Sequence, residues 1–210
     1  MRRAEMPILA DPSSSASGWS AHDARDAALM QRIGAGEREA FETLYRTYIA
    51  RLDRFLQRML RRPPVIEEVI NDTMYVVWHR AQQYSGGSKA STWIFGIAYR
   101  RALKALAEID DPVDFDPAWV PSDQATADAS ILRAEWREVL DGAMAQLTAE
   151  QRAVIELTYY HGCPYREIAQ IMGCPVETVK TRMFYARRRL RDLLQSHRKD
   201  LPWADESSTS

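Results

Sequence analysis

A dense set of hydroxyl, carboxylate, cationic and aromatic side chains follows residue 176 at the spacing of one helix. Hydroxyls and guanidinium groups bind base edges and phosphates in a DNA major groove, and a carboxylate accepts from a cytosine amine. At about 100° per residue these side chains lie opposite or beside an apolar stripe. A merely solvated helix, which is the alternative, would not place a large ring such as Phe184 on its polar face. We therefore predict a reader of duplex DNA, made of Glu177, Thr178, Lys180, Thr181, Arg182, Phe184, Tyr185, Arg187 and Arg188.

Aromatic rings are interleaved with cations in a second stretch, between residues 89 and 104. Rings of this kind stack on unpaired bases, while the cations follow the backbone of a single strand. By this pattern alone, Trp93 and Tyr99 are equally well explained as core anchors. The single-strand hypothesis assigns DNA contacts to Lys89, Thr92, Trp93, Tyr99, Arg100, Arg101 and Lys104.

Three carboxylates, Glu67, Glu68 and Asp72, lie close together in the sequence. Paired carboxylates can perform acid-base catalysis or bind a metal, but no histidine, phosphate-binding loop or further ligand converges with them. They are interpreted as a surface for protein docking or as a solvated face.

The only cysteines, Cys163 and Cys174, flank the first helix of a predicted helix pair, and His161 lies nearby. A closed metal site needs four ligands, so these three residues are too few, and we interpret the cysteines as small apolar side chains at helix ends. No nucleophile with a base is evident. We expect no catalytic residue, no metal and no cofactor, and thus no enzyme.

The elements that position the duplex reader form a helix-turn-helix. Ile168, Ala169 and Met172 give the first helix its apolar face, Gly173 can adopt the positive φ that ends it, and Pro175 starts the second helix. An apolar stripe predicts which side of the second helix packs inward: Val176, Val179, Met183, Ala186, Leu190 and Leu193.

Helical periodicity extends over most of the chain and predicts an all-α fold of two small helical domains. A long helix from about residue 37 should end before Pro63, a second should run from about 65 to 82, and a third should start near Ser91 with a hydroxyl cap. Later, Thr148 and Gln151 have the spacing of a capping box. The expected organisation is a disordered tail (1–22), a first domain (23–107), a flexible acidic linker (108–129), a second domain (130–198) and a polar tail (199–210).

The net charge of −1 hides an asymmetry, because cations gather after residue 176 while the linker is acidic. Where the cations lie, and not the total charge, determines affinity for DNA. No run approaches the roughly 20 apolar residues that span a bilayer. We expect a cytoplasmic protein with no membrane contact of its own.

In an ordered set of segments, the chain resembles the sigma-70 family of bacterial transcription initiation factors, in its extracytoplasmic-function (ECF, group IV) form. The resemblance lies in residues 39–60, 67–84, 91–106 and 147–190. The second and third segments look like the second conserved region of that family, and the last looks like the fourth. The set is far more specific than a helix-turn-helix alone.

The resemblance implies a dissociable subunit of core RNA polymerase that directs initiation at chosen promoters. By position, Glu67, Glu68 and Asp72 would bind the clamp helices of the largest polymerase subunit. The stretch 83–104 would capture the melted minus-ten element, and the second domain would read the minus-thirty-five duplex of promoter DNA. An anti-sigma factor is expected as inhibitor. The alternatives are a stand-alone dimeric helix-turn-helix regulator and, with less support, an enzyme acting on nucleic acid.

Overall fold

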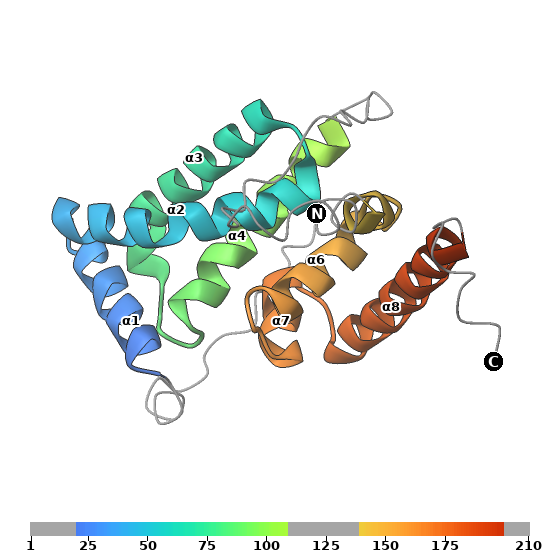
Figure 1. The fold of residues 1–210 in the computed structure, drawn as a ribbon. Helices are drawn as coiled ribbons and strands as arrows, with labels where there is room; N and C mark the ends of the chain where they lie inside the picture. The colour runs from blue at the N-terminus through green and yellow to red at the C-terminus, as the bar shows by residue number, and fades with distance from the viewer. Residues whose placement is uncertain (1–19, 109–138, 200–210) are drawn as a thin grey trace, which may run out of the picture.

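The computed structural model describes residues 20–108 and 139–199, with side chains up to residue 195. All regular structure in these two ranges is helical, as the periodicity predicts (Figure 1). The first range holds α1 (Ala21–Gly34), α2 (Arg38–Leu60), α3 (Pro63–Arg80), the 3-10 turn η2 (Ala81–Gln83) and α4 (Ala90–Glu108). The second holds a helical stretch over residues 139–145 and then α6 (Ala149–Tyr159), α7 (Tyr165–Met172) and α8 (Val176–Lys199).

Helix α2 is the central element of the first group and packs against α1, α3 and α4. Its buried side chains recur every three or four residues, and Tyr48 and Phe55 are among the largest of them. The hydroxyl of Tyr48 donates to the buried carboxylate of Asp26 at 2.5 Å and so joins α2 to α1. Burial of this stripe is what assembles the four helices.

Two predicted helix starts differ from the structure by one or two residues, and the predicted hydroxyl cap is wrong. Helix α3 already begins at Pro63, since a proline at the first helical position lacks only an N–H that would have no partner there. Helix α4 begins at Ala90, so Ser91 and Thr92 lie inside its first turn. The Thr92 hydroxyl is buried without a hydrogen-bond partner and does not cap the helix.

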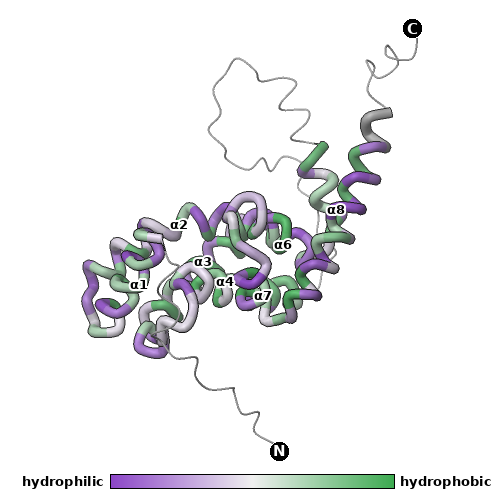
Figure 2. Tube along the Cα trace, turned by 90° about the horizontal axis from the view of Figure 1, so that it is seen from below, coloured by the Kyte–Doolittle hydropathy of each residue, from purple (hydrophilic) through white to green (hydrophobic). Residues whose placement is uncertain are grey.

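The second group follows the sequence closely. Thr148 and Gln151 form the predicted capping box of α6. Helix α7 ends at Gly173, which has φ 63° and ψ 38°. On α8, Val179, Met183 and Ala186 are buried as the apolar stripe requires. Figure 2 shows polar and apolar residues alternating along this helix.

The two groups pack on each other in the described part of the chain. Helix α7 lies against α4, and α6 lies against α2 (Figure 1). Buried apolar side chains of both groups form one continuous cluster. Beside this cluster the half-buried His161 ring lies 4.7 Å from Phe95 and 6.1 Å from Phe55, measured between ring centroids. The predicted linker and both tails lie largely outside the described residues.

Among the described helices, none is long and apolar enough to cross a membrane. The same residues contain no group of three or more histidine, cysteine, aspartate or glutamate side chains placed to hold a metal ion.

Candidate nucleic-acid interface

The outer face of α8 is open to solvent. Phe184 is 61% exposed and Tyr185 is 53% exposed, with their ring centroids 5.5 Å apart. Large rings on a solvated face are unusual unless a partner covers them. The other predicted contacts surround this pair: Glu177, Lys180, Thr181, Arg187 and Arg188 are exposed, whereas Thr178 and Arg182 are half-buried.

Local geometry fixes the direction of α8. The Gly173 N–H donates to the carbonyl of Ala169, and the left-handed backbone at this glycine turns the chain within two residues. The carbonyl of Pro175 then accepts from the N–H groups of Thr178 at 3.0 Å and Val179 at 3.2 Å. The turn therefore starts α8 directly after α7, with Lys180 and Thr181 of its first two turns exposed.

Several of the cations have intramolecular partners. Lys180 Nζ lies 2.7 Å from Glu177 Oε1 on the same helix. The Arg187 guanidinium lies over the Tyr159 ring, 5.6 Å from its centroid, which draws it toward α6. Arg182 donates weakly to the sulfur of Cys174 at 3.7 Å. Arg188 is exposed and lies beside Phe184, because it follows Phe184 by one helical turn.

The predicted single-strand reader on α4 is only partly exposed. Arg100 and Lys104 are exposed, and Trp93 is half-buried with its ring 5.9 Å from Tyr84. Thr92 and Tyr99 are buried, at 4% and 3% exposure. In this arrangement Tyr99 is thus a core side chain, which is the alternative that the sequence pattern left open.

Lys89, in the loop before α4, is held by carboxylates from two other helices. Its Nζ lies 2.8 Å from Glu167 Oε1 on α7 and 3.5 Å from Asp23 Oδ2 on α1. The hydrogen bond to Glu167 raises the pKa of Lys89, so the ammonium stays charged. Burial raises the pKa of Tyr99 to about 12, although the nearby Arg182 guanidinium acts in the opposite direction.

The predicted docking carboxylates line the outer side of α3. Glu67 and Glu68 are exposed, while Asp72 Oδ2 lies 3.0 Å from the Arg101 guanidinium of α4. Two residues that the sequence assigned to different partners are therefore paired with each other.

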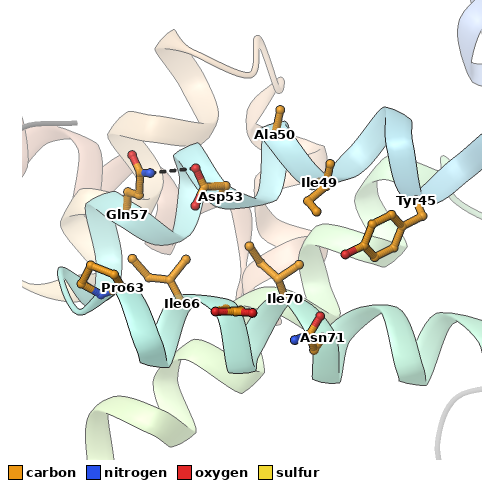
Figure 3. Close-up of a pocket in the computed structure, with 10 residues that line it drawn as sticks. Tyr45, Ile49, Ala50, Asp53, Gln57, Pro63, Ile66, Ile70 and Asn71 are labelled. Atoms are coloured by element: carbon orange, nitrogen blue, oxygen red, sulfur yellow. Dashed lines mark hydrogen bonds between the residues drawn. The ribbon is translucent and has the colours of Figure 1, made fainter. Parts of the chain in front are cut away.

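A groove of about 480 Å³ runs between α2 and α3 beside Glu67 (Figure 3). Ile66 and Ile70 of α3 face Ile49 of α2 and form an apolar floor. Asp53 accepts from the Gln57 amide at 2.7 Å on the α2 rim. The helical pattern predicted the α3 residues of this groove, but no motif in the sequence indicated the α2 residues that form its other side.

A cluster of charged residues between the two helix groups was missed by the sequence reasoning. Arg58 of α2 forms an ion pair with Asp141, which lies 83 positions later in the chain. Arg152 of α6 donates to the carbonyl of Met59 at 3.2 Å. Glu156 is fully buried, 4.0 Å from Arg58 Nε, and burial raises its pKa to about 7. Contacts at such separations leave no periodic signal in a single sequence.

Comparison with known proteins identifies both groups of helices. Residues 44–110 match the family model described as Sigma-70 region 2, and residues 137–190 match Sigma-70, region 4. The ECF RNA polymerase sigma factor SigK of Mycolicibacterium vanbaalenii is 33% identical over 178 residues, which cover 80% of this chain and 88% of that protein. SigK of Mycobacterium tuberculosis is 31% identical over 173 residues, covering 80% and 92%.

Two solved structures share the fold. CnrH, in complex with the cytosolic domain of CnrY, superposes with a TM-score of 0.61 at 21% identity, covering 82% of this chain and 98% of that one. RpoE from Bartonella quintana, in complex with the anti-sigma factor NepR, superposes with a TM-score of 0.60 at 24% identity, covering 74% and 96%. Two region models in the family's order, together with curated relatives above 30% identity along most of their length, place the chain in the sigma-70 family, among the ECF sigma factors.

Proposed function

We propose that this chain binds core RNA polymerase and directs initiation at specific promoters, with α8 reading the minus-thirty-five duplex and the α4 region capturing the melted minus-ten strand. The observation that carries the proposal is the exposed aromatic and cationic face of α8, on a chain that also matches region 2 of the family. It would act in the cytoplasm, where its polymerase and promoters are.

The reading face offers chemistry for both bases and backbone. A bidentate arginine contact to guanine gives about 1–3 kcal/mol of discrimination, which Arg188 could supply. Phe184 would contact a thymine methyl group, and Lys180 would release Glu177 to bind a phosphate. Such a domain selects a sequence but binds weakly by itself.

Melting a promoter requires the polymerase. Opening about ten base pairs forfeits roughly 1.4 kcal/mol of stacking per step. Each base stacked on an aromatic ring recovers about 1–3 kcal/mol, and the α4 region presents few rings. The sigma chain therefore supplies recognition, and the complex with polymerase supplies the remaining contacts.

The docking surface that we propose combines the α3 carboxylates with the groove between α2 and α3. An apolar floor of Ile49, Ile66 and Ile70 flanked by Glu67 suits a helix with an apolar stripe and a basic edge. We assign this surface to the clamp helices of the largest polymerase subunit, with Glu68 and Asp72 extending the acidic side.

Run-off transcription with purified core polymerase on genomic fragments tests the assignment of function and identifies a cognate promoter. On that promoter, Arg188→Ala should lower minus-thirty-five binding by about 10- to 100-fold, while Arg191→Ala, on the same helix outside the predicted reader, should not. Lys180→Ala should reduce the slope of log affinity against log salt by about one unit. Normal initiation by both Arg188→Ala and Lys180→Ala would refute the reading face.

A pull-down with core polymerase tests the docking surface. Reversing both Glu68 and Asp72 to arginine should weaken association, whereas Glu39→Arg, in the exposed first turn of α2 and outside the proposed docking surface, should leave it intact. Unchanged association of the double variant, with unchanged circular dichroism, would remove α3 from the interface.

A footprint separates the sigma factor from a dimeric regulator. The sigma factor should protect two promoter elements only when polymerase is present, and a dimeric regulator would protect paired half-sites alone. As a member of this family the chain is also proposed to have an anti-sigma factor, whose binding should abolish the run-off product.

A further inference from the structure

A hollow of about 360 Å³ lies beside the duplex reader, where α8 meets the start of α6. Two of its lining residues, Tyr185 and Arg188, belong to the predicted reader. The remaining lining residues have been assigned no contact with DNA: Gln146, Gln151, Arg189 and Asp192. The hollow therefore continues the reading face of α8 toward α6.

Hydrogen-bond donors dominate the lining of this hollow. An arginine side chain has only donors, and a glutamine whose oxygen is engaged still has an NH₂ group that donates. Both glutamine oxygens are engaged: Gln151 Oε1 accepts from the Thr148 N–H at 3.1 Å, and Gln146 Oε1 accepts from Arg189 Nη2 at 3.4 Å. The hollow therefore suits a ligand that offers acceptor oxygens.

The charge of the hollow favours an anion. In the described ranges, neither Arg188 nor Arg189 forms an ion pair with a carboxylate, and Arg189 is oriented by the neutral amide of Gln146. Asp192 is the single acidic residue in the lining, so it offsets only one of the two cations. Guanidinium groups bind the oxygens of a phosphate through paired hydrogen bonds.

The position of the hollow fits the backbone of a duplex that α8 enters. An α-helix with its side chains is about 10–12 Å across and the major groove is about 12 Å wide, so the flanks of the helix face the two sugar-phosphate strands. Arg189 follows Arg188 by one residue and lies about 100° around the helix from it, on such a flank. Arg188 can then contact base edges while Arg189 contacts the backbone.

We propose that this hollow binds a backbone phosphate beside the minus-thirty-five element, with Arg189 as the principal cation and the amides of Gln146 and Gln151 as further donors. The inference rests on the proposed function of α8 and extends the DNA contact to the start of α6. Phosphate contacts fix the register of a protein on DNA and carry no direct sequence information. The site thus positions α8 in the groove, while Arg188 and Phe184 select bases.

Fluorescence anisotropy of the full chain on the cognate duplex and on a scrambled duplex tests the cation. Arg189→Gln should weaken binding to both duplexes by the same factor and reduce the slope of log affinity against log salt by about 0.9 units, the value for one phosphate. Its deficit relative to wild type should shrink about 3.5-fold between about 50 and 200 mM salt. The matched control Arg46→Gln removes an exposed arginine of α2, outside the hollow, and should leave the slope unchanged. A wild-type slope for Arg189→Gln would overturn the proposal.

Two substitutions of opposite sign test the charge inside the hollow. Asp192→Asn removes the lining carboxylate and should tighten binding to both duplexes. Gln146→Glu adds a carboxylate beside Arg189 and should weaken it. Both side chains are exposed, so the fold should be kept, which circular dichroism checks. Affinity changes of the same sign in the two variants would contradict a phosphate in this hollow.

A methylphosphonate scan of the cognate duplex locates the phosphate. Replacing one phosphate at a time by an uncharged methylphosphonate should weaken binding of wild type at the contacted position, and this loss should disappear in Arg189→Gln because the two changes remove the same interaction. Losses of equal size in wild type and Arg189→Gln at every position would overturn the proposal.

Two results distinguish this site from the function on which it rests. If Arg188→Ala loses discrimination between the cognate and scrambled duplexes while Arg189→Gln keeps the wild-type salt slope, the phosphate site is wrong and the reader stands. If wild type fails in run-off transcription while Arg189→Gln still flattens the slope on both duplexes, the sigma function is wrong and the hollow still binds DNA.

Discussion

Glu156 lies in the interface between α2 and α6 with no exposed surface, and neither of its carboxylate oxygens has a hydrogen-bond partner among the described residues. Burial disfavours the charged form, and the attraction of Arg58 and Arg54 only partly compensates, so the pKa rises from 4.5 to about 7. Replacing Glu156 by glutamine keeps the shape and removes the charge.

The raised pKa sets the sign and size of the effect. Between pH 4.5 and 7 the folded protein holds a proton on Glu156 that the unfolded chain has released, so this group lowers stability as pH rises. A difference of about 2.5 pKa units corresponds to roughly 3 kcal/mol. Glu156→Gln should therefore stabilise the protein by up to about 3 kcal/mol at pH 8, and the gain should vanish below pH 4.5.

Urea denaturation followed by circular dichroism, repeated from pH 4.5 to pH 8.5, measures this difference. A parallel thermal scan at pH 8 should show a melting temperature higher by roughly 6–12 °C for Glu156→Gln than for wild type. His161 has the opposite dependence, because burial and nearby arginines lower its pKa to about 4, so its contribution is lost as pH falls below 6.5. It is present in both proteins and cancels in the comparison.

A stability difference that stays constant across this pH range would refute the reasoning. It would mean that Glu156 is charged at every pH tested, held by Arg58 strongly enough to offset its desolvation. A loss of stability at pH 8 would lead to the same conclusion more directly.

Three further changes test other parts of the structure. Thr148→Ala removes the N-cap of α6 and should lower the free energy of unfolding by about 1 kcal/mol in urea titrations; no change would show that the capping box is unimportant. Tyr48→Phe removes the hydroxyl that donates to the buried Asp26 carboxylate at 2.5 Å, and it should lower the free energy of unfolding by about 1–3 kcal/mol in the same titrations. An unchanged free energy would show that the nearby His22 satisfies this carboxylate without Tyr48. Phe184→Ala should leave stability unchanged but weaken minus-thirty-five duplex binding about tenfold in anisotropy, since contact with DNA would bury the exposed ring. Equal affinity of the variant and wild type would exclude Phe184 from the contact with DNA.

The helix faces were predictable because their signals are local. On α8, burial of Val179, Met183 and Ala186 and exposure of Phe184 follow from a period of 3.6 residues, which needs only neighbours in sequence. The cap at Thr148 was predictable for the same reason. The starts of α3 and α4 differ from the prediction by one or two residues, since helix ends depend on weak local preferences.

The interface between the helix groups was not predictable. In α6, residues 153–157 are all buried, because α8 covers one side and α2 the other. From sequence alone, a glutamate in such a run is ordinarily expected to face solvent. Glu156 is buried because α2, about a hundred positions earlier in the chain, packs against α6. Likewise, nothing near Lys89 indicates that Glu167 is its partner.

The pairing of Asp72 with Arg101 has a consequence for the order of events at a promoter. Both side chains are partly solvated, and ion pairs of this kind are worth at most about 1 kcal/mol, so either member can exchange its partner readily. If polymerase takes the carboxylate on α3, the guanidinium on α4 is released at that moment. Docking of polymerase on α3 would thus free the Arg101 guanidinium on α4 through an exchange of side-chain partners.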